Sequence, residues 1–224
     1  MTDIKRYVFE TQEDWLQWRV GMFTSSEVNR LMAEPTKKAK EAGKLLSEGA
    51  VTYIIEKLSA QFEAPKPVYF SNEMQWGNDN EPSAALLLCD LLSLDPQSDE
   101  VIYTSEGGKV LFSDGKLGGT PDMILPFAIA EIKCPNSDTH LYYKAFVNAY
   151  NFKDELPKYY DQMQANMYLC EREFCAFLSY DPRFKDEVRQ YHYIAIKRDQ
   201  ERINQILEKV SIAFDYMQEL KTKL

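Results

Sequence analysis

The chain has 224 residues, of which 45% are hydrophobic, enough to build a substantial buried core. Its net charge of −9, from 26 basic and 35 acidic residues, argues against a protein that binds nucleic acid through a uniformly basic surface. No apolar run reaches the roughly 20 residues of a membrane span, and the first ten residues contain no apolar signal core, so we expect a cytoplasmic protein with no membrane partner.

The N-terminal half of the chain is expected to be mainly helical. Thr24–Glu27 has the capping-box pattern, which predicts that a helix begins there. The lysine-rich segment 35–44 is predicted to be an exposed loop. Helical patterns then cover residues 45–62 and 73–92, and Pro82 should make the second helix irregular.

The middle of the chain changes to short β-prone runs separated by glycine-containing turns. The predicted strands are residues 101–103, 110–112, 123–125, 129–133, 175–180 and 191–196. The remaining predicted helices are residues 139–147, 157–171 and 200–220. Helices flanking a mixed central β-sheet predict an α/β or α+β fold, with one domain covering residues 1–224.

Three residues with chemical potential lie on two neighbouring predicted strands. Asp122 begins one strand, and Glu131 and Lys133 lie on the next. Side chains two apart on a strand project to the same face, so Glu131 and Lys133 should point together while Ile132 points into the core. Opposite charges on a strand usually form a solvated face. Here the surrounding residues are apolar, and a charge among them is costly unless it has a function.

Two carboxylates and one amine around a single point suit the hydrolysis of a phosphodiester. Carboxylates such as Asp122 and Glu131 bind Mg²⁺, and the main-chain carbonyl of Ile132 offers a further oxygen ligand. Lys133 could orient or deprotonate the attacking water, or stabilise the developing charge. The four cysteines have no C-x-x-C spacing and only two histidines are present, which disfavours a zinc site.

Several further motifs accompany this set along the chain. They are Trp15–Gly21, Thr24–Glu27, Trp76–Glu81, Gly119–Asp122, Glu131–Pro135, Gln162–Gln164 with Tyr168, and Tyr180–Arg183. The series resembles the phage lambda exonuclease family, the YqaJ-type viral recombinase nucleases of the PD-(D/E)xK superfamily, over about residues 13–200. The resemblance implies a restriction-endonuclease-like core.

Residue roles follow from the resemblance at the matching positions. The catalytic residues that it implies are Asp122, Glu131, Lys133, Glu81, Gln164 and Tyr168. Asp122, Glu131 and the carbonyl of Ile132 would bind Mg²⁺, for which Mn²⁺ could substitute. Gln164 and Tyr168 are four residues apart on a helix and share a face, so they would line the catalytic pocket together. Without the family, Glu81 reads equally as a charge near a helix start, and the other two as a polar helix surface.

Two further roles concern the end of a DNA duplex. Arg19, Thr24 and Ser26 resemble a pocket for a terminal 5′-phosphate, because hydroxyl groups and a fork-shaped cation favour a phosphate dianion. A simple helix cap would also explain Thr24. Met74 falls where the family places an apolar wedge that separates the strands, although a buried core methionine is an alternative reading.

The resemblance implies a 5′→3′ exonuclease that acts on linear double-stranded DNA from 5′-phosphorylated ends and leaves 3′ single-stranded tails for recombination. It also implies a homotrimeric ring, a single-strand annealing protein as partner, and a bacterial host cytoplasm. A ring would let an acidic exterior coexist with a basic channel. The segment between Cys134 and Gln162 departs from the family pattern, which leaves the loops that contact DNA and other subunits open.

Two alternatives remain open from the sequence. One is another PD-(D/E)xK nuclease, either an endonuclease or a RecB-like or Cas4-like enzyme. The iron–sulfur members of that group need cysteines near the C-terminus, whereas the last cysteine here is Cys175. The other alternative is a non-catalytic module that binds DNA ends, which the presence of all three core residues disfavours.

Overall fold

The computed structural model describes residues 3–64, 71–104 and 109–224. Its strands are β1 (Lys5–Phe9), β2 (Phe23–Thr24), β3 (Ile102–Tyr103), β4 (Lys109–Ser113), β5 (Leu117–Gly119), β6 (Met123–Ile124), β7 (Ile129–Lys133), β8 (Phe174–Tyr180) and β9 (Tyr191–Lys197). Its helices are α1 (Gln12–Trp18), the 3₁₀ helix η1 (Ser25–Leu31), α2 (Lys37–Glu41), α3 (Glu48–Ala60), α4 (Asn72–Leu91), α5 (Ser137–Phe146), α6 (Phe152–Glu155), α7 (Pro157–Leu169), α8 (Glu187–Gln190) and α9 (Gln200–Lys221).

The described strands form two mixed sheets. One has the order β1-β4-β5-β2, with β2 parallel to β5, and the other has the order β3-β6-β7-β8-β9, with β7 parallel to β8. The predicted α/β class, with mixed strand pairing flanked by helices, is therefore confirmed, and the described strands divide between two sheets. The chain leaves β5 of the first sheet and enters β6 of the second within residues 120–122, so the two sheets meet where Asp122 lies.

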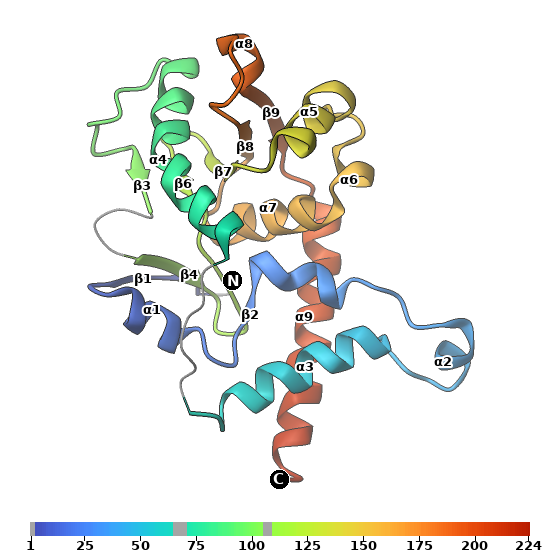
Figure 1. The fold of residues 1–224 in the computed structure, drawn as a ribbon. Coiled ribbons are helices and arrows are strands. Elements are labelled where there is room, and N and C mark those ends of the chain that lie inside the picture. Colours follow the sequence, from blue (N-terminus) through green and yellow to red (C-terminus); the bar gives the residue numbers. More distant parts are fainter. Residues whose placement is uncertain (1–2, 65–70, 105–108) are drawn as a thin grey trace.

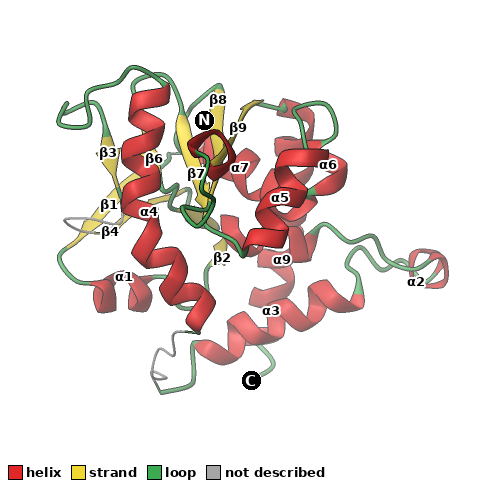
Figure 2. Ribbon diagram, turned by 45° about the horizontal axis from the view of Figure 1, so that its top comes forward, coloured by secondary structure: helices red, strands yellow, loops and turns green. Residues whose placement is uncertain are grey.

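Helices cover both faces of the five-stranded sheet, with α4 on one side and α5, α6 and α7 on the other (Figure 2). The alternation along β7 explains this arrangement. Ala130 and Ile132 belong to an apolar cluster with Leu88 of α4, whereas Ile129 packs with Met163 of α7. Ile132 is 3% exposed, as predicted for the residue between Glu131 and Lys133.

A third apolar cluster joins α3, η1 and α9 beside the four-stranded sheet. Helix α9 runs from the sheets to the C-terminal end of the chain (Figure 1). Its buried residues are Ile203, Ile206, Val210, Ala213 and Met217, whose alternating spacing of three and four puts them on one face. This amphipathic helix agrees with the predicted helix 200–220. None of the helices in the described ranges combines the length and apolar content that crossing a membrane requires.

In the N-terminal half the predicted helix start near Ser25 is confirmed, but the capping box does not form, and segment 35–44 is not simply a loop. Ser25–Leu31 forms a 3₁₀ helix whose cap residue, Thr24, makes no side-chain capping bond. Glu27 instead pairs with Lys57 of α3 at 2.8 Å, because an ion pair between packed elements outcompetes the local capping box. The segment 35–44, expected to be a loop, contains the short helix α2. This helix lies at the end of a segment that projects away from the other helices and strands (Figure 1).

The approach of η1 and α7 to the first sheet requires a glycine at position 119. A Cβ atom there would lie 2.3 Å from Oδ1 of Asn166 on α7 and 2.9 Å from Oγ of Ser25 on η1. Distances this short are repulsive, so only glycine allows the three segments to pack together. This close packing brings the chain before η1 next to the chain after β5.

Candidate active site

Asp122 lies at the fork where β6 and β7 separate. Its main-chain N–H donates to the carbonyl of Ala130 at 3.0 Å, as in a continuing antiparallel ladder. At the next step its carboxylate replaces the main chain, because the N–H of Ile132 donates to Oδ2 of Asp122 at 2.6 Å. The buried hydroxyl of Thr104 donates to the carbonyl of Pro121 at 2.6 Å and fixes the approach to the fork.

Glu131 and Lys133 lie on the same face of β7 and form an ion pair with each other. The Nζ atom of Lys133 also lies 4.0 Å from Oδ2 of Asp122, so the three side chains converge. The Glu131 side chain is only 1% exposed, whereas those of Asp122 and Lys133 are 21% and 25% exposed. The amide of Gln162 on α7 donates to Oε1 of Glu131 at 2.5 Å. The cluster is therefore a largely buried site with one open side.

Burial perturbs the acid–base properties of this cluster. Burial is the largest effect on Glu131, the charge of Lys133 opposes it, and the charges of Asp122 and Glu81 add to it, so that together they raise the pKa of Glu131 to about 7. Burial also raises the pKa of Asp122. Burial alone would lower the pKa of Lys133, but the two adjacent carboxylates outweigh this effect and raise it. Two carboxylates share one ammonium, so an additional cation would be favourable here.

The residues present fit a divalent metal ion. Oε2 of Glu131 is buried and has no hydrogen-bond partner within residues 3–64, 71–104 and 109–224. An unsatisfied buried carboxylate oxygen is expensive, and a cation would satisfy it. No three Asp, Glu, His or Cys side chains of the described chain form a metal-binding group. Asp122 and Glu131 would therefore need main-chain and water ligands as well, which is how proteins usually bind Mg²⁺.

Glu81 on α4 lies on the other side of the sheet but close to the same site. Its Oε1 atom accepts a hydrogen bond of 3.1 Å from the hydroxyl of Tyr103. Its charge helps to raise the pKa values of Glu131 and, after the larger effect of burial, of Cys134, which follows Lys133 in the chain. The position of Glu81 is compatible with the role expected of it, an acidic residue on α4 that supports the metal site.

Of the two glutamines on α7, Gln162 contacts the carboxylate cluster, whereas the predicted Gln164 contacts the main chain at the end of β9 and just after it. Gln164 is fully buried, its Nε2 donates to the carbonyl of Lys197 at 3.0 Å, and its Oε1 accepts from the N–H of Asp199 at 2.8 Å. Residues two apart on a helix point in nearly opposite directions, so a helix that aims Gln162 at Glu131 must aim Gln164 away. The structure therefore brings Gln162, and not the predicted Gln164, to the carboxylate cluster.

Tyr168 shares the face of Gln164 and not that of Gln162. Its hydroxyl donates to Oδ2 of Asp114 at 3.1 Å, and its ring packs against the cluster of α3 and α9. The aromatic residue that reaches the site is Tyr159, whose ring centroid lies 5.4 Å from Nζ of Lys133. Tyr159 and Gln162 are three residues apart and share a helix face, a spacing that could have identified both in the sequence.

A small cavity of about 190 Å³ opens beside Asp122. It is lined by Trp15, Arg19, Ser25, Ser26, Thr104, Thr120 and Asp122. The cavity follows from the parallel pairing of β2 with β5, because the chain leaves both strands at the same edge of the sheet. Residues 25–26 follow β2 and residues 120–122 follow β5 there, so their side chains meet.

Arg19 provides the positive charge of this cavity. Its guanidinium lies 4.0 Å from the ring centroid of Trp15, and burial lowers its pKa without removing its charge at neutral pH. Of the two predicted hydroxyl residues, Ser26 lines the cavity, whereas Thr24 is 2% exposed and contacts Ser26 at 3.4 Å. The second hydroxyl residue that lines the cavity is Ser25 and not the predicted Thr24. The sequence pattern did not distinguish between these two neighbouring residues.

Met74 lies in the first turn of α4 and is 50% exposed. The alternative that it is a buried core methionine is therefore wrong. An exposed apolar side chain at a helix start is available to contact a partner molecule.

A mixed sheet between helices that carries two carboxylates and an amine at one point is the arrangement typical of a metal-dependent nuclease of the restriction-endonuclease-like class. The chain belongs to the YqaJ-like viral recombinase domain family, whose profile matches residues 14–173. No curated protein matches the sequence at a significant level.

Solved structures agree with this family. The chain is similar to LHK-Exo, an alkaline exonuclease from Laribacter hongkongensis, with 25% identity, a TM-score of 0.69, and coverage of 95% of this chain and 97% of that one. LHK-Exo in complex with dAMP matches with 27% identity, a TM-score of 0.70 and the same coverage. A phage-related exonuclease from Haemophilus somnus 129PT, at 21% identity, TM-score 0.70 and coverage of 90% and 96%, shares the fold. Family and fold together support a nuclease.

Proposed function

We propose that the protein is a Mg²⁺-dependent 5′→3′ exonuclease that degrades one strand of linear duplex DNA from 5′-phosphorylated ends. The observation that carries this proposal is the position of Asp122, which belongs both to the carboxylate cluster and to the wall of the Arg19 cavity. A site that could bind a terminal phosphate thus adjoins a site suited to hydrolysis. The mononucleotide in the LHK-Exo complex, dAMP, has the chemistry of an exonuclease product.

The carboxylate cluster would hold the metal through Asp122 and Glu131, with the carbonyl of Ile132 as a further ligand and with Mn²⁺ able to replace Mg²⁺. When bound, the metal supplies a lowered pKa for a coordinated water and neutralises charge on the phosphate. Lys133 keeps its proton between the carboxylates and donates hydrogen bonds toward the reacting oxygen atoms. Gln162 fixes the orientation of Glu131 by bonding to Oε1, which leaves Oε2 for the cation.

The Arg19 cavity would hold the 5′-phosphate of the strand to be degraded. Arg19 is held in place by the face of Trp15, so its fork is preorganised for a bidentate contact with phosphate. The hydroxyls of Ser25 and Ser26 line the same cavity and would donate to the phosphate, and the hydroxyl of Thr24 lies 3.4 Å from that of Ser26. A phosphate bound in this cavity sets the direction of digestion, because the first scissile bond is then presented from the 5′ side.

The rest of the proposal concerns the assembly. Exposed Met74 would separate the terminal base pair before one strand enters the site. A homotrimeric ring would enclose the duplex and create a channel more basic than the net charge of −9 suggests. The 3′ tail would pass to a single-strand annealing protein for recombination in the cytoplasm of a bacterial host. The strands and helices that hold the active-site residues would be supported by Gly119, Glu81 and Tyr168.

The experiment is an end-labelled digestion. Linear duplexes labelled at the 5′ or 3′ end, with phosphate or hydroxyl at the 5′ terminus, are incubated with the protein and Mg²⁺, with EDTA as the control. We expect release of mononucleotides from the phosphorylated 5′ end and persistence of the 3′ label in a lengthening single strand. Cleavage of closed circular plasmid would favour the endonuclease alternative. Binding to ends without any release would favour the non-catalytic module.

A further inference from the structure

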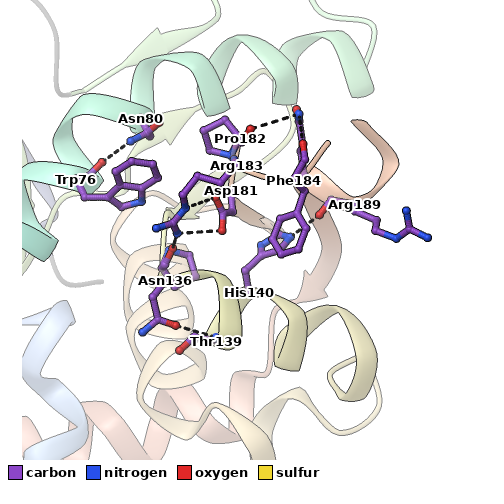
Figure 3. Close-up of polar contacts among 12 residues, drawn as sticks. Trp76, Asn80, Asn136, Thr139, His140, Asp181, Pro182, Arg183, Phe184 and Arg189 are labelled. Atoms are coloured by element: carbon purple, nitrogen blue, oxygen red, sulfur yellow. Dashed lines mark hydrogen bonds and ion pairs between the residues drawn. The ribbon is translucent and has the colours of Figure 1, made fainter. Parts of the chain in front are cut away.

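The chain that follows β8 makes an unusual set of contacts with the active-site elements (Figure 3). It belongs to the Tyr180–Arg183 motif, which begins with the last residue of β8 and to which the proposed function assigns no role. Arg183 donates from Nε to Oδ1 of Asp181 at 2.7 Å and from Nη2 to Oδ2 at 2.9 Å. The same Nη2 donates to the carbonyl of Pro135 at 3.0 Å, and the guanidinium lies 4.2 Å from the ring centroid of Trp76. One side chain therefore joins three separate parts of the fold.

The loop that carries Arg183 is also held in place by His140 of α5. His140 is fully buried and bridges Oγ of Ser179 at 2.8 Å and the carbonyl of Arg189 at 2.9 Å. Because a carbonyl only accepts, Nε2 of His140 is the donor and Nδ1 accepts from the serine hydroxyl. The ring of Phe184 lies 5.5 Å from the His140 ring and closes the loop over it (Figure 3). These contacts fix the backbone on both sides of Arg183.

Asp181 makes the geometry of Arg183 rigid. It is fully buried, and a buried carboxylate needs charge-assisted partners. The two parallel hydrogen bonds from Arg183 supply them, and this fork geometry allows few other orientations of the guanidinium. The plane of the guanidinium is thereby presented to the indole of Trp76.

Trp76 and Pro135 connect this clamp to the carboxylate site. Trp76 lies on α4, five residues before Glu81, and its buried Nε1 has no hydrogen-bond partner in the parts of the chain that are described. Stacking on Arg183 is thus a principal contact that orients the indole. Pro135 follows Lys133 by two residues and directly follows Cys134, which packs against the α4 cluster. Arg183 consequently holds the first half of α4 against the exit of β7.

We infer that Arg183 is a positioning residue, which clamps α4 through Trp76 to the exit of β7 through Pro135 and so fixes the position of Glu81 relative to Glu131. The inference rests on the proposed function, because it assigns to this contact the geometry of the metal-binding carboxylates. Supporting groups of this kind typically change metal affinity by about 10- to 100-fold when they are altered. Arg183 would affect metal affinity through its hold on helix α4 and not through a direct bond to a metal ligand.

The test uses variants that leave buried Asp181 paired. Trp76→Leu removes the stacking partner but keeps the Asp181–Arg183 pair, and Arg183→Lys keeps the charge but removes the fork. Glu81→Gln removes the charge that the clamp is inferred to position. Arg189→Ala is the matched control, because its side chain is 60% exposed on α8, in the same connection between β8 and β9. The double variant Trp76→Leu/Glu81→Gln completes a double-mutant cycle.

Each variant is titrated with Mn²⁺ in the absence of DNA, and the melting temperature reports metal binding. We expect Trp76→Leu and Arg183→Lys to raise the Mn²⁺ concentration for half-maximal stabilisation by about 10-fold. Glu81→Gln should do the same, the double variant should show no further rise, and Arg189→Ala should match the wild type. A wild-type Mn²⁺ response in Trp76→Leu and Arg183→Lys, or additive shifts in the double variant, would overturn the inference.

The absence of Mn²⁺ stabilisation in the wild type would overturn it too. Digestion of phosphorylated duplex, measured against Mg²⁺ concentration in parallel, separates this inference from the proposed function. If the wild type binds Mn²⁺ but releases no nucleotide, the proposed function fails while the titration still decides the role of Arg183. If nucleotides are released and the titrations of all variants coincide, the function stands and the inference fails.

Discussion

Two polar sites meet at Asp122, and they differ in charge and in the way they are built. On one side, Asp122 joins Glu131 and Lys133 in a cluster formed by neighbouring strands of one sheet. On the other side, Asp122 lines a cavity whose positive charge comes from Arg19. This cavity lies where the chain leaves the parallel strands β2 and β5 of the other sheet. The first suits a cation and the second suits an anion. A junction between two sheets can thus place both beside the same phosphate-sized space.

The two sites also show how a chain with a net charge of −9 could carry out the proposed reaction on a polyanion. The acidic cluster is 1% exposed at Glu131 and is shielded by Lys133, so its field is largely neutralised locally. Arg19 is held against Trp15 inside the cavity and does not depend on a basic surface. The following predictions test whether the two sites act separately on chemistry and on end recognition.

The largest effect is expected from the carboxylate cluster. Asp122→Ala, Glu131→Ala or Lys133→Ala should each slow nucleotide release by about 10²- to 10⁴-fold, because each removes a metal ligand or the ammonium group that donates to the reacting oxygen atoms. Release of labelled nucleotides from linear duplex in Mg²⁺ measures this, and gel-shift binding to duplex ends should persist. Lys158→Ala, an exposed lysine on α7, is the control. Activity within a few-fold of the wild type would place the chemistry elsewhere.

The second effect concerns the Arg19 cavity. Arg19→Ala should slow digestion of 5′-phosphorylated ends by about 10- to 100-fold, the size of losing hydrogen bonds to a charged group, and should leave 5′-hydroxyl ends unchanged. Initial rates on the two substrates, taken as a ratio, give the measurement. Arg19→Lys should fall between, because it keeps the charge but loses the fork. An equal loss on both substrates would show that Arg19 serves the fold or the chemistry and not the terminal phosphate.

The two glutamines of α7 offer a matched pair with opposite outcomes. Gln162→Ala should reduce turnover by about 10-fold, since Glu131 loses the partner that orients it. Gln164→Ala should leave turnover nearly unchanged but lower the free energy of unfolding by about 1–3 kcal/mol, because it leaves the buried main-chain partners at Lys197 and Asp199 unsatisfied. Single-turnover rates and denaturant midpoints separate them. The reverse pattern would restore Gln164 to the catalytic pocket.

These two residues show what a sequence can and cannot predict about the site. The strand period of two correctly placed Glu131 and Lys133 together and Ile132 in the core, because that alternation is local. Choosing between Gln162 and Gln164 requires the rotation of α7 about its axis, which is set by packing against β7 and η1. Neither contact is encoded in the spacing of the two glutamines.

The same contrast between local patterns and distant contacts explains which parts of the fold were predicted. Long helices with a clear apolar face, such as α9, were predicted because their period is visible in the sequence. The division into two sheets was not, because it depends on pairings between distant segments: β1 pairs with β4, and Gly119 accommodates Asn166. The 3₁₀ helix at Ser25–Leu31 likewise depends on a distant partner, since Lys57 draws Glu27 away from its capping position.

The smallest expected effect tests whether the duplex end is opened before it reaches either site. Met74→Ala should slow digestion of blunt duplex by about 3-fold, because an apolar wedge lowers the cost of unstacking a terminal base pair. A substrate whose 5′ nucleotides are already unpaired should be digested at the wild-type rate. Met74→Leu keeps the apolar volume and should behave like the wild type on both substrates.

Leu86→Ala is the appropriate control, since Leu86 is also exposed on α4, at 58%, but lies three turns further along the helix. If it slows blunt-end digestion as much as Met74→Ala does, the effect belongs to the stability of α4 and not to a wedge. If Met74→Ala slows both substrates equally, Met74 acts after strand separation, on the strand already bound between the Arg19 cavity and the carboxylates. The ratio of rates on paired and unpaired ends therefore decides at which stage the first turn of α4 contacts DNA.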